Sequence, residues 1–263
     1  MSDAIQNYYD NYDEDGRLLK KYGQVEYLTT MRYIDKYLTD GAKILELGAG
    51  TGRYSHALAL RGFEVDAVEY SPHNFEIFKS KTTPEEKITV RLGDARDLSA
   101  SADDTYDITL LLGPLYHMFT VEDKKQTISE ALRVTKPGGV VFAAYCISDA
   151  SIMVSGFKLG LFNVAEFVEK GFINTETFEV HSEPELIFEL VRKEQIDALM
   201  SSFPVSRLHF VATDLYTKHF QETVESMNDA TFALYLQYHF AICERPDMMG
   251  LSHHTLDVFR KNV

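Results

Sequence analysis

Strand and helix patterns alternate along the chain between residues 43 and 146. Short segments rich in β-branched and other apolar residues are separated by stretches whose apolar residues recur at helical spacing. Repeated units of strand, helix and strand produce a parallel sheet covered by helices on both faces. We expect the first five strands at residues 43–48, 64–69, 88–93, 106–113 and 139–146.

The rest of the chain is expected to extend this core on both sides. A helical lead-in covers roughly residues 18–38, after an acidic segment rich in tyrosine. Residues 148–181 lack a clean period and are interpreted as an excursion over one edge of the sheet. A helix then resumes after the capping-box pattern at residues 182–185, with apolar residues at helical spacing up to Val191.

Two more strands are predicted near the C-terminus, at residues 205–215 and 254–261, with an amphipathic helix at residues 232–243 between them. We expect the last strand to pair antiparallel beside the others and to close the sheet. The sequence therefore predicts a doubly wound, Rossmann-like α/β fold with a seven-stranded, mostly parallel sheet, helices on both faces and an insertion after the fifth strand.

Composition and charge restrict the partners of this fold. The 263 residues carry 26 Lys and Arg against 40 Asp and Glu, a formal charge of −14 that repels a phosphate backbone. No apolar run approaches the ~18 residues that a membrane span needs, and the N-terminus lacks a basic stretch followed by an apolar one. We therefore expect a cytoplasmic protein that binds neither nucleic acid nor membranes, and we leave its oligomeric state open.

Cysteines and histidines give no sign of a disulfide framework or a metal site. Cys146 and Cys243 are the only cysteines, and we expect both to be buried free thiols. His253 and His254 are adjacent on a predicted strand, so their side chains point to opposite faces. No metal site is predicted.

The first strand runs into a glycine-rich turn, ILELGAGTGRY, with Gly48, Gly50 and Gly52. Glycines at such a turn let backbone N–H groups approach a ligand beyond the carboxyl ends of the strands. The dinucleotide fingerprint needs a third glycine or alanine at position 53, where this chain has Arg53, and the Gly-Lys-Ser/Thr of a P-loop does not follow. The turn thus favours a nucleoside-type ligand over a phosphate-binding site.

Three carboxylates follow successive strands at the same rim of the sheet: Glu46 on the first, Glu69 at the end of the second and Asp94 just beyond the third. Glu69 is placed to accept hydrogen bonds from two ribose hydroxyls, and Asp94 from an exocyclic adenine amine. A ligand with a cationic sulfonium and an ammonium group suits such an acidic rim better than a pyrophosphate.

At these positions the chain resembles the class I S-adenosylmethionine-dependent methyltransferases of the small-molecule type. The resemblance covers residues 43–146 closely and the rest loosely, and it rests on ELGAGTG, Glu69, Gly93-Asp94-Ala95, LLLGPLYHM and LRVTKPGGVV. It implies S-adenosyl-L-methionine as the cofactor and a methyltransferase domain at residues 43–263. In that domain residues 148–202 form a substrate-side excursion and helix, and residues 1–42 precede it as a helical lead-in or lid.

The resemblance also implies roles for single residues. Glu69 holds the ribose, and Glu46 orients the glycine loop and contacts the cofactor's ammonium group through water. The other implied cofactor-binding residues are Gly48, Ala49 and Gly50 at the amino-acid part, Asp94 and Ala95 beside the adenine, and Tyr70 and Leu112.

Methyl transfer from a positively charged sulfur requires alignment of the nucleophile and exclusion of water, and a base only where the nucleophile loses a proton. His117 is our candidate base and Tyr116 a candidate substrate contact, because GPLYH ends the fourth strand, where this family presents residues toward the transferring methyl group. The alternative is that both side chains pack the loop. GPLY also differs from the Asn/Asp-Pro-Pro-Tyr motif common in enzymes that methylate amino groups of nucleic acids, which argues against nucleic-acid substrates.

Further candidates lie outside these motifs. Tyr8, Tyr9 and Tyr12 belong either to a lid whose aromatic rings cover the sulfonium by cation–π contact or to a solvated tail. Arg17 and Arg32 are candidates for the cofactor carboxylate, with surface salt bridges as the alternative. Secondary candidates for the substrate pocket, with core packing as the alternative, are Tyr145, His181 and His239.

The sequence thus predicts an enzyme that transfers a methyl group from S-adenosylmethionine to an oxygen, nitrogen, sulfur or carbon atom of a small soluble metabolite. Two alternatives stay open. A NAD-dependent oxidoreductase shares the βα architecture and Glu69, although Arg53 and Asp94 count against it. A non-catalytic module that binds S-adenosylmethionine shares the cofactor motifs.

Overall fold

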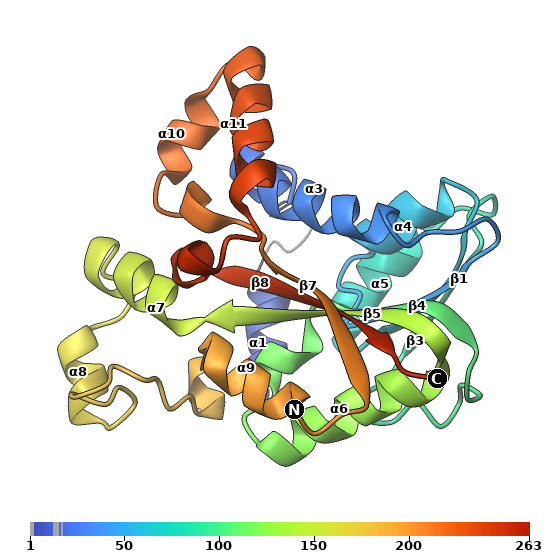
Figure 1. Cartoon of the computed structure of the whole chain (residues 1–263), viewed down its shortest axis with the longest axis horizontal. Helices are drawn as coiled ribbons and strands as arrows, with labels where there is room; N and C mark the ends of the chain where they lie inside the picture. The colour runs from blue at the N-terminus through green and yellow to red at the C-terminus, as the bar shows by residue number, and fades with distance from the viewer. Residues whose placement is uncertain (1–2, 13–15, 17) are drawn as a thin grey trace.

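The computed structural model describes residues 3–12, 16 and 18–263, and its centre is one open eight-stranded sheet (Figure 1). The strand order is β3-β2-β1-β4-β5-β8-β7, and β6 pairs with β5 off this path. The strands are β1 (Lys43–Leu47), β2 (Glu64–Glu69), β3 (Ile88–Leu92), β4 (Tyr106–Leu111), β5 (Thr135–Ile147), β6 (Leu190–Val191), β7 (Val205–Ala212) and β8 (His254–Lys261).

The first five strands are parallel, as the alternating pattern predicted. β1 lies between β2 and β4, with Glu46 opposite Ala67 on one side and Leu110 on the other. Its residues Ile44, Leu45 and Leu47 are completely buried, because helices cover both faces of a parallel sheet. The change of direction in strand order beside β1 places a crevice beyond the carboxyl ends of β1 and β4, where ligands bind in folds of this type.

Helices pack on both faces of the sheet. Figure 1 shows α3 (Lys21–Asp35) and α4 (Arg53–Ala59) above the sheet, and α6 (Val121–Val134) and α9 (Lys193–Met200) below it. Helix α6 begins after a capping residue, since the Thr120 side chain accepts a hydrogen bond of 3.1 Å from the Asp123 N–H. The other helices are α1 (Asp3–Asn11), α5 (Pro72–Lys81), α7 (Ser148–Ser151), α8 (Val164–Glu169), α10 (Gln221–Ser226) and α11 (Asp229–Ile242).

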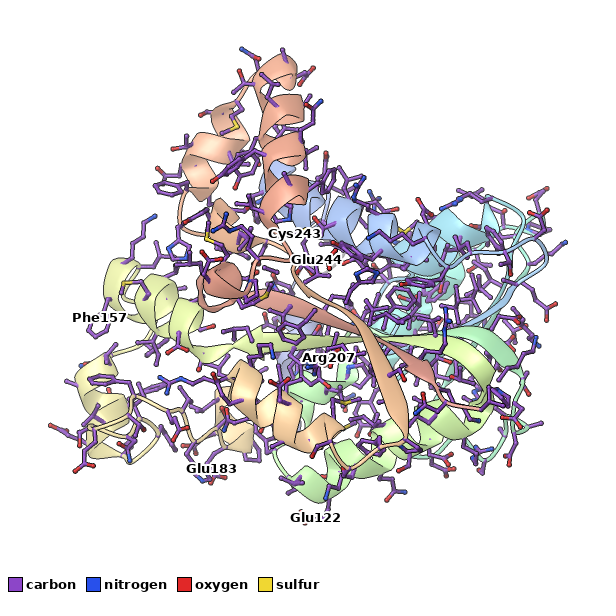
Figure 2. The ribbon with its side chains drawn as sticks, in the orientation of Figure 1. Glu122, Phe157, Glu183, Arg207, Cys243 and Glu244 are labelled. Atoms are coloured by element: carbon purple, nitrogen blue, oxygen red, sulfur yellow. The ribbon has the colours of Figure 1, made fainter. Side chains whose placement is uncertain are left out.

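The sheet differs from the prediction in strand number and order, because β6 is an eighth strand that was not predicted. β8 was expected to close the sheet, but it is inserted between β5 and β7, antiparallel to both, and the sheet stays open. Its interior position accounts for a run of buried residues from Thr255 to Phe259. The run includes Asp257, whose Oδ1 lies 2.7 Å from the Nε of Arg207 on β7, the side chain labelled in Figure 2.

The helix predicted from residue 182 is wrong in its first half. Residues Pro184–Leu186 form a single 3₁₀ turn, β6 follows, and the helix α9 begins only at Lys193. Two tertiary contacts explain the difference: the Glu189 N–H donates to the Tyr116 carbonyl at 2.8 Å, and the His117 Nδ1 lies 2.9 Å from the carbonyl of Ile187, whose φ is +67°. These contacts hold the segment in extended form against the loop after β4. The apolar residues at helical spacing therefore do not form a helix there.

The excursion after β5 carries α7, a π-helical segment η2 (Ile152–Lys158) and α8. It projects beyond the end of β5, and Phe157 at its far side points to solvent (Figure 2). Both cysteines are free and buried, as predicted. None of the helices in the described ranges combines the length and apolar character that crossing a bilayer requires.

Candidate functional site

The glycine turn between β1 and α4 adopts a conformation that needs glycine at three positions. Gly48, Gly50 and Gly52 have φ values of +67°, +56° and +87°. A side chain on Gly48 would place its Cβ 2.7 Å from the Cδ of Pro114, so the turn also lies against the loop after β4. The N–H groups of Gly48 and Ala49 both donate to the Val68 carbonyl at 2.8 and 3.2 Å, which fixes the turn beside the end of β2.

Glu69, at the end of β2, ties this turn in place. Its Oε2 accepts a hydrogen bond of 2.7 Å from the Gly50 N–H, and its Oε1 accepts one of 2.7 Å from the Ser71 N–H. The residue is 5% exposed and lines a cavity at this rim of the sheet. A carboxylate offers about four acceptor positions, so both oxygens retain the capacity to accept from a ligand hydroxyl.

Glu46 lies beneath the turn and also lines the cavity. Burial raises the pKa of its carboxyl to about 8, despite a hydrogen bond from the Ser55 hydroxyl. Glu46 is therefore mainly protonated at neutral pH in this state, and the rim is less acidic than its residue types indicate.

The cavity brings together most of the residues that the sequence predicted. Its walls come from the glycine turn, the end of β2, the start of the loop after β3, the loop after β4, and α1. The predicted residues among its lining are Glu46, Gly48, Ala49, Gly50, Glu69, Tyr70, Ala95, Leu112, Tyr116 and His117.

Other predicted residues lie elsewhere. Asp94 does not line the cavity, because its carboxylate turns to Arg96, with Oδ2 2.7 Å from Nη2. Burial alone would raise the pKa of Asp94, but Arg96 outweighs it and leaves the pKa below its usual range. Tyr12 lines a second cavity, Arg32 stacks 4.9 Å from the ring of Phe240, and Arg17 lies outside the described residues.

The secondary candidates are also separated from the first cavity. Tyr145 is buried and donates to the Met200 sulfur at 3.7 Å, and His181 pairs with Glu183 at 2.9 Å near the surface. Both line a third cavity, on the side of the sheet that carries α9. His239 is buried in α11, and burial lowers its pKa to about 4.

The sequence did not assign Arg53 to the site, although this residue lines the cavity. Its guanidinium lies 4.7 Å from the ring of Tyr27, and its Nε is buried without a hydrogen-bond partner among the described residues. A buried donor without a partner is costly, so Arg53 is placed to receive an anionic group from a ligand. Its position one residue after the glycine turn was the available signal.

His117 and Tyr9 join the loop after β4 to α1. His117 is 6% exposed, its Nδ1 lies 2.9 Å from the Ile187 carbonyl, and its Nε2 lies 2.7 Å from the Tyr9 hydroxyl. Because a carbonyl oxygen only accepts, Nδ1 donates and Nε2 accepts from Tyr9. Burial lowers the pKa of His117 from the ordinary 6.5 to about 4. The side chain is therefore neutral at physiological pH and a weaker base than an exposed histidine.

We expect acid to destabilise the protein between about pH 6.5 and about pH 4 through its buried histidines. Burial lowers the pKa of His117, His239 and His253 to about 4, whereas in the unfolded chain a histidine titrates near 6.5. The unfolded state then binds more protons, so the stability present above pH 6.5 falls as the pH approaches 4. Thermal unfolding is measured at about pH 7 and at about pH 5. The Tm of His117→Gln should fall less between these two pH values than the Tm of the parent.

His254 works in the opposite direction, because its carboxylate neighbours raise its pKa, and its contribution is lost as the pH rises through that raised value. The comparison with His117→Gln isolates one of these groups. An equal loss of Tm in both proteins would show that His117 is not kept neutral by folding.

A second cavity of about 470 Å³ adjoins the first, and Tyr9 and Tyr116 line both. Aromatic rings from α1, from the excursion and from the segment before β6 surround it. Tyr8 meets Phe188 edge to face with ring centroids 5.3 Å apart, and Phe162 stacks on Phe167 at 4.6 Å. The excursion and α1 therefore line a space directly beside the cavity at the glycine turn.

Residues 44–139 match the family model described as a methyltransferase domain. The strand order, the glycine turn and the Glu69 cavity agree with a class I, S-adenosylmethionine-dependent methyltransferase.

Similar proteins agree with this assignment. The chain is 31% identical over 132 residues to a demethylmenaquinone methyltransferase of Clavibacter sepedonicus, covering 49% of this chain and 52% of that protein. It is 33% identical over 104 residues to the cypemycin N-terminal methyltransferase of a Streptomyces species, covering 39% and 41%. The chain matches about half the length or less of these curated relatives.

Solved structures share the fold at low sequence identity. A S-adenosylmethionine-dependent methyltransferase of Methanosarcina mazei has a TM-score of 0.59 and 16% identity, and the match covers 88% of this chain and 97% of that one.

Proposed function

We propose that this protein is an S-adenosylmethionine-dependent methyltransferase that acts on a small molecule. The observation that carries the proposal is the convergence on one cavity of the glycine turn, the Glu69 carboxylate and the Arg53 guanidinium. These groups match the three polar parts of the cofactor, which are its amino-acid backbone, its ribose and its carboxylate. The bound cofactor would supply an electrophilic methyl group on a positively charged sulfur.

The residues present fit this cofactor. The turn at Gly48 and Gly50 would lie against its amino-acid part, because both glycines line the cavity and neither carries a side chain that would occupy it. Glu69 would accept from the ribose hydroxyls, and the Nε of Arg53 would gain the partner that it lacks among the described residues. Ala95 and Leu112 would form apolar walls for the adenine.

The acceptor would enter from the second cavity and meet the cofactor at the shared residues Tyr9 and Tyr116. Helix α1 covers this junction, held by the bond of Tyr9 to His117 and by the contact of Tyr8 with Phe188. We propose that residues 1–42 act as the lid of the domain, because this coverage excludes water from the place of transfer.

His117 is the proposed partner of the acceptor's nucleophilic atom. Its Nε2 lone pair faces the junction and now accepts from Tyr9, so an acceptor hydroxyl or amine that displaced Tyr9 would find a hydrogen-bond acceptor in place. With a pKa of about 4 in this environment, His117 serves best to orient the nucleophile, and it takes up a proton only as the nucleophile gains positive charge in the transfer.

The small-molecule acceptor is supported by the second cavity. The relatives act by name on demethylmenaquinone and on the N-terminus of cypemycin, so similarity to them alone leaves the acceptor open. A cavity of about 470 Å³ between α1 and the excursion is of the size that binds single small ligands.

The cofactor assignment is tested by titration calorimetry with S-adenosylhomocysteine and with NADH. We expect S-adenosylhomocysteine to bind in the micromolar range or tighter and NADH to give no heat of binding, because Arg53 replaces the third glycine of the dinucleotide turn. Binding of NADH alone would favour an oxidoreductase. Binding of S-adenosylhomocysteine without methyl transfer to any compound in a broad metabolite panel would favour a non-catalytic binding module.

A further inference from the structure

The second cavity has an aromatic wall and a polar end. The wall is formed by rings from α1 and the residue just after it, from the excursion and from the segment before β6: Tyr8, Tyr12, Phe162, Phe167 and Phe188. The polar end is formed where β5 and β8 lie side by side and by the segment after β7, and it presents Cys146, Lys218, His253 and His254. A ligand that filled this space would place a flat apolar body against the rings and a polar group at the other end.

Lys218 contributes an ammonium group to the polar end. The residue lines the cavity, and its Nζ lies 5.4 Å from the centroid of the Tyr22 ring. Among the described residues no carboxylate lies within ion-pair distance of Lys218. The lining therefore includes a positive side chain that no carboxylate of the described residues pairs with directly.

His253, beside it, has an unused polar atom. Its Nε2 is buried and has no hydrogen-bond partner among the described residues. Burial lowers the pKa of His253 to about 4, so the ring is neutral at physiological pH. An unpaired buried nitrogen at the wall of a cavity costs stability unless a ligand or water meets it.

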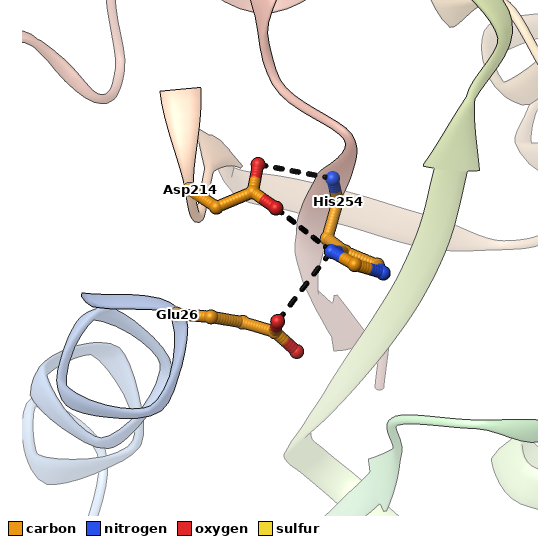
Figure 3. Close-up of side chains that lie close together, drawn as sticks. All are labelled: Glu26, Asp214 and His254. Atoms are coloured by element: carbon orange, nitrogen blue, oxygen red, sulfur yellow. Dashed lines mark hydrogen bonds and ion pairs between the residues drawn. The ribbon is translucent and has the colours of Figure 1, made fainter. Parts of the chain in front are cut away.

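His254 also carries a positive charge, and this charge is paired with two carboxylates. Its Nδ1 lies 2.8 Å from Oδ2 of Asp214 and 3.4 Å from Oε2 of Glu26 (Figure 3). Burial would lower the pKa of His254, but Glu26, the Cys146 thiol and Asp214 together raise it well above the usual value. The ring is charged, and neither carboxylate lines the cavity.

The same three residues are near enough to one another to suggest a metal site, with ligand atoms within 4.8 Å. Ion pairing already accounts for the arrangement. Asp214 accepts at Oδ1 from the Ser252 hydroxyl and from the N–H groups of His253 and His254, and its Oδ2 pairs with the imidazolium. We therefore interpret the cluster as the support of a charged His254.

We propose that the second cavity binds the methyl acceptor, and that the acceptor is an aromatic molecule with an acidic group that pairs with Lys218 and hydrogen-bonds to His253. That the ligand accepts a methyl group rests on the proposed function. Its chemical class, an aromatic molecule with an acidic group, follows from the cavity alone. The rings supply the apolar contact, and the charge of Lys218 selects an anion over a neutral or cationic group, whereas Asp214 and Glu26 balance the charge of His254. The negative side chain among the lining is Glu185, which is exposed.

The test uses two matched probes, 1-hydroxy-2-naphthoate and its neutral amide, 1-hydroxy-2-naphthamide. Each is titrated into the full chain saturated with S-adenosylhomocysteine, and into the full chain without it, by calorimetry. We expect the carboxylate to bind at least about tenfold more tightly than the amide, as a charge-assisted hydrogen bond predicts. Lys218→Gln should remove this preference, and Lys218→Arg should keep most of it.

Lys87→Gln is the matched control, because it removes the same charge at an exposed position away from the cavity. It should retain the preference for the carboxylate, and all variants should keep the Tm of the parent within a few degrees. Absence of probe binding, equal affinity for the two probes, or a preference that survives in Lys218→Gln would overturn the inference. Failure of S-adenosylhomocysteine to bind in the same titrations would instead count against the proposed function, since the probes are also measured without it.

Discussion

Glu69→Gln is expected to weaken the binding of S-adenosylhomocysteine by about a hundredfold. The substitution keeps the size of the side chain but replaces one carboxylate oxygen by an N–H₂ donor. Both oxygens now accept from backbone N–H groups, of Gly50 and Ser71, so the new donor faces another donor at one of them. The lost hydrogen bonds to the ribose and to the turn are charge-assisted, and each contributes roughly 1.5–3 kcal/mol. Titration calorimetry measures the change.

Glu64→Gln is the control for this prediction. Glu64 lies at the opposite end of the same strand, its side chain is 57% exposed, and it pairs with Lys43 at 2.9 Å. Such surface pairs contribute little, so affinity for S-adenosylhomocysteine should stay within about twofold of the parent. If Glu69→Gln binds as tightly as Glu64→Gln, the carboxylate has no part in holding the cofactor.

Gly48→Ala is expected to lower the stability of the protein by about 2–5 kcal/mol and to abolish cofactor binding. Two costs add: a left-handed backbone conformation for alanine, about 1–2 kcal/mol, and overpacking, about 1–3 kcal/mol. The second arises because the Cβ would lie 2.7 Å from the Cδ of Pro114, in a loop that also carries Tyr116 and His117. The Tm should fall on the order of 10 °C in thermal unfolding followed by circular dichroism.

Gly41→Ala separates these two costs. Gly41 has a φ of +75°, close to the +67° of Gly48, but a Cβ there would have nothing within 4 Å. Only the backbone cost of about 1 kcal/mol should be seen, with unchanged affinity for S-adenosylhomocysteine. Equal losses of stability in the two variants would mean that the contact with Pro114 is not tight in solution.

The sequence predicted the core of the fold because its signals are local. Each of the first five strands is a short apolar segment, and the crossover helices α5 and α6 have their own caps at Ser71 and Thr120. The position of β8 was not predictable in this way. Its apolar residues show that it is buried, but which strands it pairs with depends on contacts between residues more than a hundred positions apart, such as Cys146 with His254.

In the candidate site, too, some features were predictable from the local sequence and others were not. The turn at Gly48 and the carboxylate of Glu69 follow strand ends, and parallel strands bring their carboxyl ends to one rim, so the pattern alone placed them. Asp94 satisfied the same rule, yet its side chain turns to Arg96, two residues further on. The strand pattern predicts where the backbone of a residue lies at the rim. The direction of its side chain depends on the partners available nearby, which for Asp94 include Arg96.

The sequence by itself determined that this chain forms a doubly wound sheet with a glycine turn and a carboxylate at its rim, because those features depend on residues close together along the chain. Only the tertiary structure decided that Arg53 faces the same cavity, that α1 covers it through Tyr9 and His117, and that a second, aromatic cavity with Lys218 at its polar end lies beside it. Those features depend on the packing of remote segments, in which burial sets both which side chains meet and which of them carry charge.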